Sequence, residues 1–237
     1  MAFYKNDHLE QGSASWHAWR RSVLGASEAK VVMGDRRFLS KRSLVQEKLG
    51  VIAPFGGNAI TREGHRLEIL ARNELCEIYG EAILPAIVQD SRIPYLAASL
   101  DGITLNGDEV FEIKCGAADY ERVNNSKRVP SYHYAQIQHI LMITQHENMV
   151  FAAYRPDRKL IAIRIERDET YIKKLRKKEI EALELNQKLK AEADKAQESA
   201  REAQQQQIAE ERKQKARKFW SNKPLVIAST AIGLVGI

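Results

Sequence analysis

Two stretches of the chain place hydrophobic residues at the spacing of an amphipathic helix, one over residues 62–79 and the other over residues 131–145. The residues on their hydrophobic faces are Leu67, Ala71, Leu75 and Ile78 in the first stretch, and Ile137, Ile140, Leu141 and Thr144 in the second. Gly80 follows the first stretch directly, which is typical of a helix C-terminus. We therefore predict two helices that each cover a hydrophobic core.

The first 60 residues carry shorter patterns, which predict two helical segments joined by polar turns. Ser40 is a suitable N-cap for a helix over residues 41–49, because its hydroxyl can accept a hydrogen bond from a free backbone N–H group of the first turn. Gly50 ends that helix, and the run Pro-Phe-Gly-Gly at residues 54–57 then interrupts the helical pattern.

A β-hairpin is predicted where two mostly apolar runs, residues 93–100 and 110–115, flank the pair Asn106-Gly107. Asn-Gly favours a two-residue type I′ turn, since both residues tolerate positive φ angles. Such a turn also predicts the register of the two strands. The directly opposed pairs are then Leu105 with Asp108, Ile103 with Val110, and Asp101 with Glu112.

Two carboxylates face each other in this register. Directly opposed side chains of an antiparallel pair lie about 4.5–5.5 Å apart at Cβ, and like charges there destabilise the pair. Lys114 shares the face of Glu112, and hard oxygen ligands of this kind suit Mg²⁺. Solvated charges on a surface hairpin are the simpler alternative, but Glu112 and Lys114 interrupt an apolar strand, where charges need partners. The pattern therefore favours a functional cluster that holds a divalent cation.

The remainder of the chain predicts two more strands and a long helix. Residues 148–154 and 159–165 are apolar and rich in β-forming residues, and residues 155–158 between them have the composition of a turn. Residues 168–218 consist mostly of Glu, Lys, Ala and Gln without Gly or Pro, which predicts one continuous helix. The expected fold is a mixed α/β (α+β) fold, with a central β-sheet flanked by helices and a long C-terminal helix.

Five sequence motifs give the chain a resemblance to a known family. Leu100-Asp101-Gly102 followed by Glu112-Ile113-Lys114-Cys115 resembles the active-site signature of the phage lambda exonuclease and YqaJ-type viral recombinase family, within the PD-(D/E)xK nuclease superfamily. The other motifs, in family order, are Trp16–Arg20 with Gly25–Glu28, Gly64–Glu68, Tyr134–Gln138 and Ile165–Glu169. The motifs span roughly residues 10–190, and the resemblance implies a restriction-endonuclease-like core.

The resemblance implies a metal-dependent active site. Asp101, Glu112 and the backbone carbonyl of Ile113 would bind Mg²⁺, with Mn²⁺ as a substitute, and Glu68 would bind a second ion directly or through water. Glu68 follows Leu67 at the edge of a hydrophobic helix face, so an exposed helix residue is the alternative. A divalent ion polarises a phosphate and helps to generate hydroxide, as phosphodiester cleavage requires.

Four further residues receive roles from the resemblance. Lys114 would orient or deprotonate the attacking water, or stabilise charge on the phosphorane, and the sequence does not separate these roles. Gln138 lies near the inward face of its helix, where its amide would hold a water or orient Lys114. Arg20 and Ser27 match positions that hold a terminal phosphate, since an Arg fork and a hydroxyl suit an anion. A surface Arg and a helix-capping Ser are the alternatives for this pair.

The resemblance implies 5′-to-3′ digestion of one strand of linear double-stranded DNA from its ends, which leaves a 3′ overhang for a single-strand annealing protein. Lambda-type enzymes are processive because they act as homotrimeric rings that enclose the DNA. A non-processive endonuclease or nickase on the same fold is one alternative. The other is a DNA-binding or scaffold protein whose tail docks on a membrane or a partner, although the intact carboxylate set argues against a retired active site.

Charge and cysteine content agree with an intracellular protein that binds DNA. The formal net charge of +6, from 37 Lys and Arg against 31 Asp and Glu, is compatible with a polyanionic partner. Two cysteines, Cys76 and Cys115, give no disulfide framework, and no signal peptide precedes the first motif. We therefore expect the protein in the cytoplasm of a bacterial host, encoded by a phage, a prophage or a plasmid.

The sequence divides into three expected parts: a nuclease domain over residues 1–190, a charged Gln/Ala-rich helical extension over 191–218, and a short apolar tail over 219–237. A seven-residue spacing in the long helix uses small and polar residues, so a solvated helix or weak self-association is expected. Residues 224–237 would rise about 21 Å as a helix, less than the roughly 30 Å of a membrane's hydrocarbon core. We expect this tail to contact a membrane surface, or to dock on a partner or a neighbouring subunit.

Overall fold

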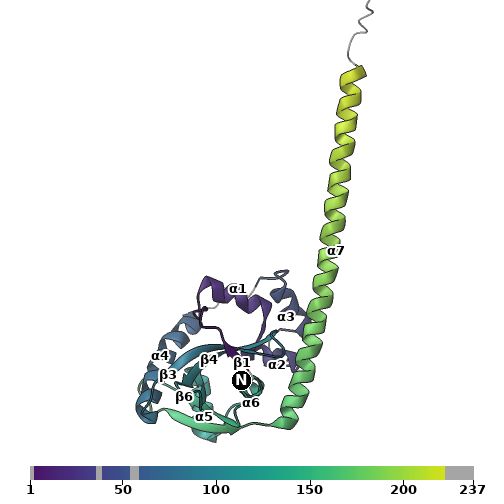
Figure 1. Ribbon diagram of the computed structural model, residues 1–237. Coiled ribbons are helices and arrows are strands. Elements are labelled where there is room, and N and C mark those ends of the chain that lie inside the picture. The colour runs from purple at the N-terminus through teal and green to yellow at the C-terminus, as the bar shows by residue number, and fades with distance from the viewer. Residues whose placement is uncertain (1–2, 36–38, 54–58, 222–237) are drawn as a thin grey trace, which may run out of the picture. The chain divides into compact units, whose positions relative to one another are not determined.

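The computed structural model describes residues 3–35, 39–53 and 59–221. Within these ranges the chain forms a mixed seven-stranded β-sheet flanked by helices (Figure 1), which confirms the predicted fold class. The strands are β1 (Phe3–Lys5), β2 (Leu24–Gly25), β3 (Ile83–Asp90), β4 (Leu96–Thr104), β5 (Val110–Lys114), β6 (Asn148–Ala153) and β7 (Ile161–Glu166). The helices are α1 (Ala14–Ser22), the 3₁₀ turn η1 (Ala26–Glu28), α2 (Ala29–Val32), α3 (Lys41–Lys48), α4 (Ala59–Tyr79), α5 (Ala117–Ser126), α6 (Ser131–Thr144) and α7 (Glu169–Ser221).

The sheet runs in the order β1-β3-β4-β5-β6-β7, and β2 pairs with β4. β3, β4 and β5 form an antiparallel meander, whereas β5 and β6 are parallel. Parallel neighbours need a crossover connection, and α5 and α6 supply it between β5 and β6. β7 then pairs antiparallel with β6, as the turn composition between these strands predicts.

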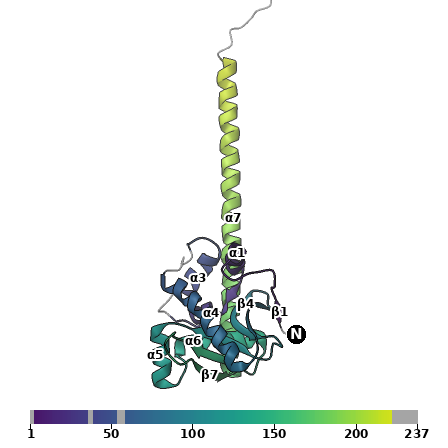
Figure 2. The same ribbon diagram turned by 90° about the vertical axis from the view of Figure 1, so that its left-hand side faces the viewer.

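The sheet carries a separate hydrophobic cluster on each face, because neighbouring residues of a strand point to opposite faces. Phe111 of β5 packs with Leu67, Ala71 and Leu75 of α4, whereas its neighbour Val110 belongs to the cluster around α6. Helices α4 and α6 therefore cover opposite faces of the sheet, and Figure 2 shows the molecule from the side of α4.

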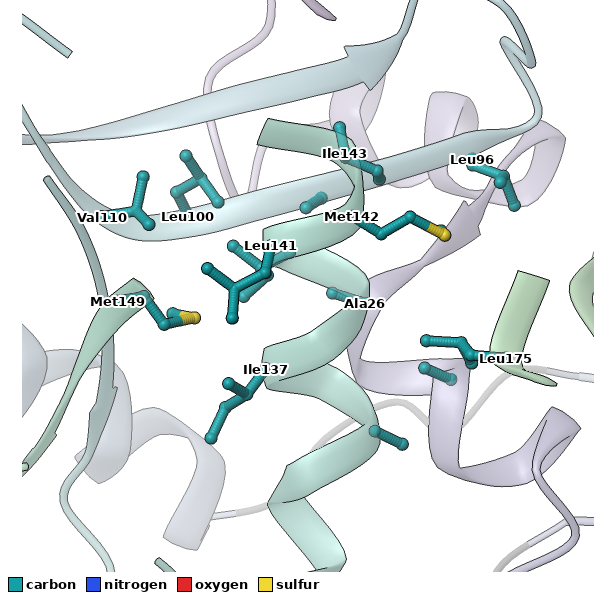
Figure 3. Close-up of a cluster of buried hydrophobic side chains, with 14 of the residues drawn as sticks. Ala26, Leu96, Leu100, Val110, Ile137, Leu141, Met142, Ile143, Met149 and Leu175 are labelled. Carbon is teal, nitrogen blue, oxygen red and sulfur yellow. The ribbon is translucent and has the colours of Figure 1, made fainter. Parts of the chain in front are cut away.

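Helix α6 is buried on nearly all sides, since it packs against the sheet, the η1–α2 segment and the first turns of α7. In Figure 3, Ile137 and Leu141 lie toward Met149, while Met142 lies toward Leu96 and Leu175. The four inward residues that the sequence predicts for this helix are all buried, which confirms that prediction: Ile137, Ile140, Leu141 and Thr144.

Helix α4 confirms the other long amphipathic pattern, with one exception. Three of its predicted inward residues are buried: Leu67, Ala71 and Leu75. The prediction for Ile78 is wrong, because its side chain is 60% exposed. At this end of α4, Cys76 and Tyr79 pack against the core cluster, so the helix turns Ile78 away from it. Gly80 follows with a φ of +69°, as its C-terminal position predicts.

The first 60 residues differ from the prediction of two helical segments. The structure places the strands β1 and β2 there, in addition to α1, α2 and α3. These strands have three and two residues, too few for a periodic pattern, and they form by pairing with the distant strands β3 and β4. The N-cap of α3 is confirmed, since Ser40 Oγ accepts a hydrogen bond from the N–H of Ser43 at 3.0 Å. The predicted interruption at residues 54–57 lies outside the described residues.

The β4–β5 hairpin has the predicted register. Ile103 pairs with Val110, and the preceding residue Gly102 pairs with Phe111. One residue further along the hairpin, an Asp101 carboxylate oxygen accepts a hydrogen bond from the backbone N–H of Ile113 at 2.7 Å. A side chain therefore replaces the backbone pairing at the position where the sequence predicts two opposed carboxylates.

The turn of this hairpin is longer than predicted. Leu105 and Asp108 do not pair, and the hairpin closes where the N–H of Thr104 donates to the carbonyl of Glu109 at 3.1 Å. The Thr104 hydroxyl accepts hydrogen bonds from the N–H groups of Asp108 and Glu109. Gly107 alone among the described turn residues has a positive φ, +75°. The predicted type I′ turn is therefore wrong, because the Thr104 side chain satisfies a wider turn of the same register.

Helix α7 confirms the predicted long C-terminal helix, but the chain divides within it into two compact units, residues 1–189 and 190–237. In the first unit, Leu175 and Ala182 of α7 are buried in the cluster around α6, so part of the seven-residue pattern serves the core. In the second unit, every described residue is exposed. The apolar residues 224–237 lie outside the described residues. None of the described helices has the length and apolar character that crossing a membrane requires.

A buried ionisable pair joins α6 to α7. His139 Nδ1 lies 2.5 Å from Glu179 Oε1, and His139 Nε2 lies 2.9 Å from the carbonyl oxygen of Ala97 in β4. Burial by itself lowers the pKa of His139, but the charge and hydrogen bond of Glu179 outweigh burial and raise this pKa above its ordinary value. The protonated form of His139 therefore stabilises the fold.

This pair predicts a pH dependence of stability. Below the ordinary histidine pKa of about 6.5, His139 is protonated in both the folded and the unfolded chain, and its stabilising effect is complete. As the pH rises through the raised folded-state pKa, the proton and the stabilisation are lost. We expect the free energy of unfolding of the wild type to fall with rising pH above about 6.5, relative to His139→Gln, in urea titrations. The exposed His8→Gln control should retain the wild-type slope, and an equal slope for His139→Gln would contradict the prediction.

Close packing of β4 on β3 predicts a second effect on stability. A Cβ added at Gly102 would lie 2.5 Å from Ile83 Cγ2 and 3.2 Å from Phe111 Cβ. We expect Gly102→Ala to lower the free energy of unfolding in urea by about 1–3 kcal/mol, the usual cost of overpacking a core. Gly64→Ala in α4 is the control, because its Cβ meets open space, and it should raise stability by about 0.5–1 kcal/mol. If Gly102→Ala is as stable as the wild type, the side chains of Ile83 and Phe111 can move to make room for the added Cβ at little cost.

Candidate functional site

An open pocket of about 200 Å³ lies beside the β4–β5 hairpin. Its walls come from α1, the turn of η1, one edge of α4, the strands β4 and β5, and the first turns of α6. The structure brings seven of the eight predicted site residues to this pocket: Arg20, Ser27, Glu68, Asp101, Glu112, Ile113 and Lys114. Gln138 is the exception.

Glu112 is the most constrained group of the pocket. Its side chain is 1% exposed, and its Oε1 atom accepts hydrogen bonds from Lys114 Nζ and, at 2.6 Å, from Gln136 Nε2. Its Oε2 atom is buried and has no hydrogen-bond partner in the described part of the chain. Such an oxygen is costly, because a buried charge needs full pairing.

The charges of the hairpin shift one another's protonation. Burial raises the pKa of Glu112 to about 8, and the nearby charge of Asp101 adds to this rise against the opposing effect of Lys114. Burial alone would lower the pKa of Lys114, but the carboxylates of Glu112 and Asp101 outweigh burial and raise it. Lys114 therefore stays an ammonium group, while burial favours the protonated form of Glu112.

Glu68 lies at the edge of α4 and lines the pocket. Its Oε1 atom accepts a hydrogen bond from Arg72 at 2.6 Å, and Arg72 Nε donates to the backbone carbonyl of Asp101 at 2.7 Å. Arg72 thus ties α4 to β4, a role that the sequence analysis missed. Its position four residues after Glu68 is the available signal, since such pairs meet on a helix. Burial and the charge of Asp101 raise the pKa of Glu68.

The oxygen donors of the pocket fit a hard divalent cation. In the described ranges, no group of three or more His, Cys, Asp or Glu side chains has an arrangement ready for a metal ion; Glu68 is bonded to Arg72 and Glu112 to Lys114. Burial, and after it the charge of Asp101, raises the pKa of both Glu68 and Glu112, and Glu112 Oε2 has no hydrogen-bond partner among the described residues. A bound cation would offset both the repulsion and the cost of burial. Carboxylate and carbonyl oxygens are the ligands that Mg²⁺ and Mn²⁺ prefer.

Arg20, at the end of α1, and Ser27, in the turn of η1, line one side of the pocket, which we call the arm. The guanidinium group of Arg20 donates from Nη2 to Ser27 Oγ at 3.1 Å and lies 4.8 Å from the ring centre of Trp16. Trp16 itself donates a hydrogen bond from Nε1 to Ser99 Oγ at 3.1 Å, which fixes the ring against β4. The arm presents a planar cation and a hydroxyl to the same pocket, a combination that suits an anion.

Gln138, expected to hold a water or to orient Lys114, does not line the pocket, and its amide hydrogen-bonds other groups. Gln138 is fully buried, its Nε2 atom donates to the carbonyl of Glu166, and its Oε1 atom accepts from the N–H of Asp168. It therefore joins α6 to the end of β7. Gln136, two residues earlier, lies about 200° away around the helix and reaches Glu112 instead. The motif Tyr134–Gln138 contains both glutamines, and hydrophobic periodicity does not tell which one faces the hairpin.

Comparison with known proteins identifies relatives of this chain. Residues 15–147 match the family model described as the YqaJ-like viral recombinase domain. A search of curated proteins found no match.

Three solved structures are similar to the chain. LHK-Exo, an alkaline exonuclease from Laribacter hongkongensis, is 24% identical, with a TM-score of 0.65 over 77% of this chain and 99% of its own. LHK-Exo in its complex with dAMP is also 24% identical, with a TM-score of 0.66 over the same shares. A phage-related exonuclease from Haemophilus somnus 129PT is 15% identical, with a TM-score of 0.55 over 72% of this chain and 96% of its own. At these identities the likeness shows a shared fold.

The family match covers more than half of the chain and contains α4, the β4–β5 hairpin and α6, the elements that form most of the pocket. The fold agrees with this match independently, since the similar structures cover most of the chain. This chain therefore belongs to the YqaJ-like viral recombinase domain family.

Proposed function

We propose that the protein is a divalent-metal-dependent DNA exonuclease, which hydrolyses one strand of linear duplex DNA from its 5′ end and leaves a 3′ single-stranded overhang. The observation that carries this proposal is the single pocket in which the acidic residues Glu68, Asp101 and Glu112 and the ammonium of Lys114 adjoin the arm of Arg20 and Ser27. The family match supports a role in viral recombination, and the similar folds belong to proteins described as exonucleases.

The oxygen donors of the pocket would hold Mg²⁺, with Mn²⁺ as a substitute. Asp101, Glu112 and the carbonyl of Ile113 would bind one ion, and Glu68 would bind a second directly or through water. When bound, such an ion polarises a phosphate oxygen and lowers the pKa of a bound water.

Lys114 and Gln136 would position the phosphate and the Glu112 carboxylate for the reaction. Lys114 remains charged beside Glu112, so its N–H groups can donate to the scissile phosphate and stabilise negative charge that develops there. Gln136 donates to the same carboxylate and so limits its rotation. Together they hold Glu112 by one oxygen, and the other oxygen has no hydrogen-bond partner among the described residues.

The arm of Arg20 and Ser27 would hold the phosphate at the end of the strand. A guanidinium fork forms two parallel hydrogen bonds with a phosphate, and the Trp16 ring beside it restricts its orientation. Anchoring the terminal phosphate there places an adjacent phosphodiester at the carboxylates. This preference for an end, more than the carboxylates themselves, would make the enzyme an exonuclease rather than an endonuclease or nickase.

The family resemblance further leads us to propose a homotrimer and a single-strand annealing protein as partners, acting in the cytoplasm of a bacterial host. Residues 1–190 would carry the nuclease activity, while 191–218 form a helical extension and 219–237 an apolar tail that docks on a membrane or a partner. Light scattering would measure the mass of the assembly. Pelleting of the full chain with vesicles, against a version that ends near Leu189, would test the tail.

Cleavage of end-labelled DNA tests the proposed activity. With Mg²⁺, we expect release of label from the 5′ ends of linear duplex DNA and no cut in closed circular DNA. Glu112→Gln and Lys114→Ala should each lower the rate by about 100-fold or more, as loss of a catalytic group does. Glu109→Gln is the matched control on the same hairpin, since Glu109 pairs with Arg164, and should stay active. Cleavage of closed circles would support an endonuclease, and DNA binding without cleavage a scaffold role.

Metal binding has a readout that does not depend on cleavage. A cation that binds the folded protein alone raises the free energy of unfolding by about 2.7 kcal/mol at a concentration 100 times Kd. We therefore expect Mg²⁺ or Mn²⁺ to raise the unfolding midpoint of the wild type and of Glu109→Gln. Asp101→Asn and Glu112→Gln should lose most of this rise. An equal rise in all four proteins would place the cation elsewhere.

A further inference from the structure

Lys48, the last residue of α3, carries an ammonium group inside the protein. Its side chain is 4% exposed, and Nζ lies 2.7 Å both from the backbone carbonyl oxygen of Arg20 and from Glu28 Oε1. Burial lowers the pKa of Lys48, while the charge of Glu28 opposes this. A buried ammonium is costly unless it is paired and hydrogen-bonded, so this position calls for a specific role.

The first contact of Lys48 fixes the end of α1. The last carbonyl groups of a helix have no partner within it, and a positive charge is favourable there. Arg20 lies in the last turn of α1, with its carbonyl bonded to the Lys48 ammonium. The backbone that carries the Arg20 guanidinium is therefore tied to α3.

The second contact fixes the turn that carries Ser27. Glu28 accepts the N–H of Gly25 on Oε2 at 2.8 Å and Lys48 on Oε1, which closes the turn around Ser27. Glu28 Oε1 also lies 3.5 Å from Arg20 Nη2. One buried ammonium thus joins the two parts of the arm, the end of α1 and the turn of η1.

We propose that Lys48 is a positioning residue that sets the separation of the Arg20 guanidinium and the Ser27 hydroxyl, and thereby determines the preference of the pocket for a 5′-phosphorylated over a 5′-hydroxyl DNA end. The inference rests on the proposed function, since it assigns the arm to a terminal phosphate. Lys48 itself does not line the pocket, so it acts through Arg20 and Glu28.

The test compares two duplexes that differ only in a 5′ phosphate or a 5′ hydroxyl. Binding is measured by fluorescence anisotropy without divalent metal, and KM and kcat are measured with Mg²⁺. We expect Lys48→Met to weaken binding of the phosphorylated end and to raise its KM by about tenfold, the worth of one charge-assisted hydrogen bond. The kcat and the KM for the hydroxyl end should not change. Lys41→Met is the matched control. Lys41 lies on the same helix as Lys48, does not line the pocket, and pairs with Glu181 of α7.

Two further variants separate positioning from a general structural effect. In an Arg20→Ala/Ser27→Ala background, Lys48→Met should not change the relative binding of the two ends any further, because both groups that it positions are already absent. The double variant Lys48→Met/Glu28→Gln leaves no unpaired buried charge, so it replaces Lys48→Met if that variant does not fold. Its reference is Glu28→Gln alone, which also removes the Glu28–Arg20 ion pair but keeps the bond of Lys48 to the Arg20 carbonyl. The double variant should lose more of the preference than this reference. Melting curves by circular dichroism verify the fold of each variant.

Four outcomes would overturn the inference. If folded Lys48→Met keeps the wild-type preference, Lys48 does not set the separation of Arg20 and Ser27. The same follows if the variant binds the phosphorylated and the hydroxyl ends more weakly by the same factor. An additional loss of preference in the Arg20→Ala/Ser27→Ala background would show that Lys48 acts elsewhere. If the wild type itself does not distinguish the two ends, both this inference and the proposed role of the arm fail, and the wild-type measurement separates that case from the others.

Discussion

The pairing of β4 with β5 is the constraint on which the pocket depends. Its register brings Asp101 beside Glu112, and the Asp101 carboxylate takes the N–H of Ile113. Two helices from opposite faces attach to this hairpin through polar side chains, Arg72 of α4 to the Asp101 carbonyl and Gln136 of α6 to Glu112. A slip of one residue would turn each strand side chain to the other face. The register of one hairpin therefore decides whether the acidic groups meet.

The protein uses buried carboxylates in two ways. Glu112 and Glu179 each keep one buried oxygen without a hydrogen-bond partner among the described residues. Glu179 pairs with His139 inside the core and links α7 to α6 and, through His139, to β4. Glu112 lines the open pocket, where a ligand can reach it. Burial of a charge thus does not mark a site by itself. A functional site needs a buried charged group that destabilises the fold and a pocket through which a ligand can reach it. Folded proteins retain such destabilising groups where function requires them.

The family match ends at residue 147, but the packing of the pocket depends on later residues. β6 pairs in parallel with β5 along the strand that carries Glu112, and Gln138 bonds α6 to the end of β7. Leu175 of α7 completes the cluster around α6. The first compact unit accordingly extends to residue 189. The matched segment supplies the groups of the pocket, and the following strands and helix hold them in place.

The sequence by itself determined the features that depend on local spacing. These are the helices α4, α6 and α7, the N-cap of α3, the strands β6 and β7, and the register of the hairpin with its acidic residues. Only the tertiary structure decided which glutamine faces Glu112, where Ile78 points, and that β1 and β2 are strands. It also revealed Arg72 and Lys48 as links between elements. The physical reason is that periodicity records which face of an element is buried, whereas polar contacts and short strands depend on partners far away in the chain.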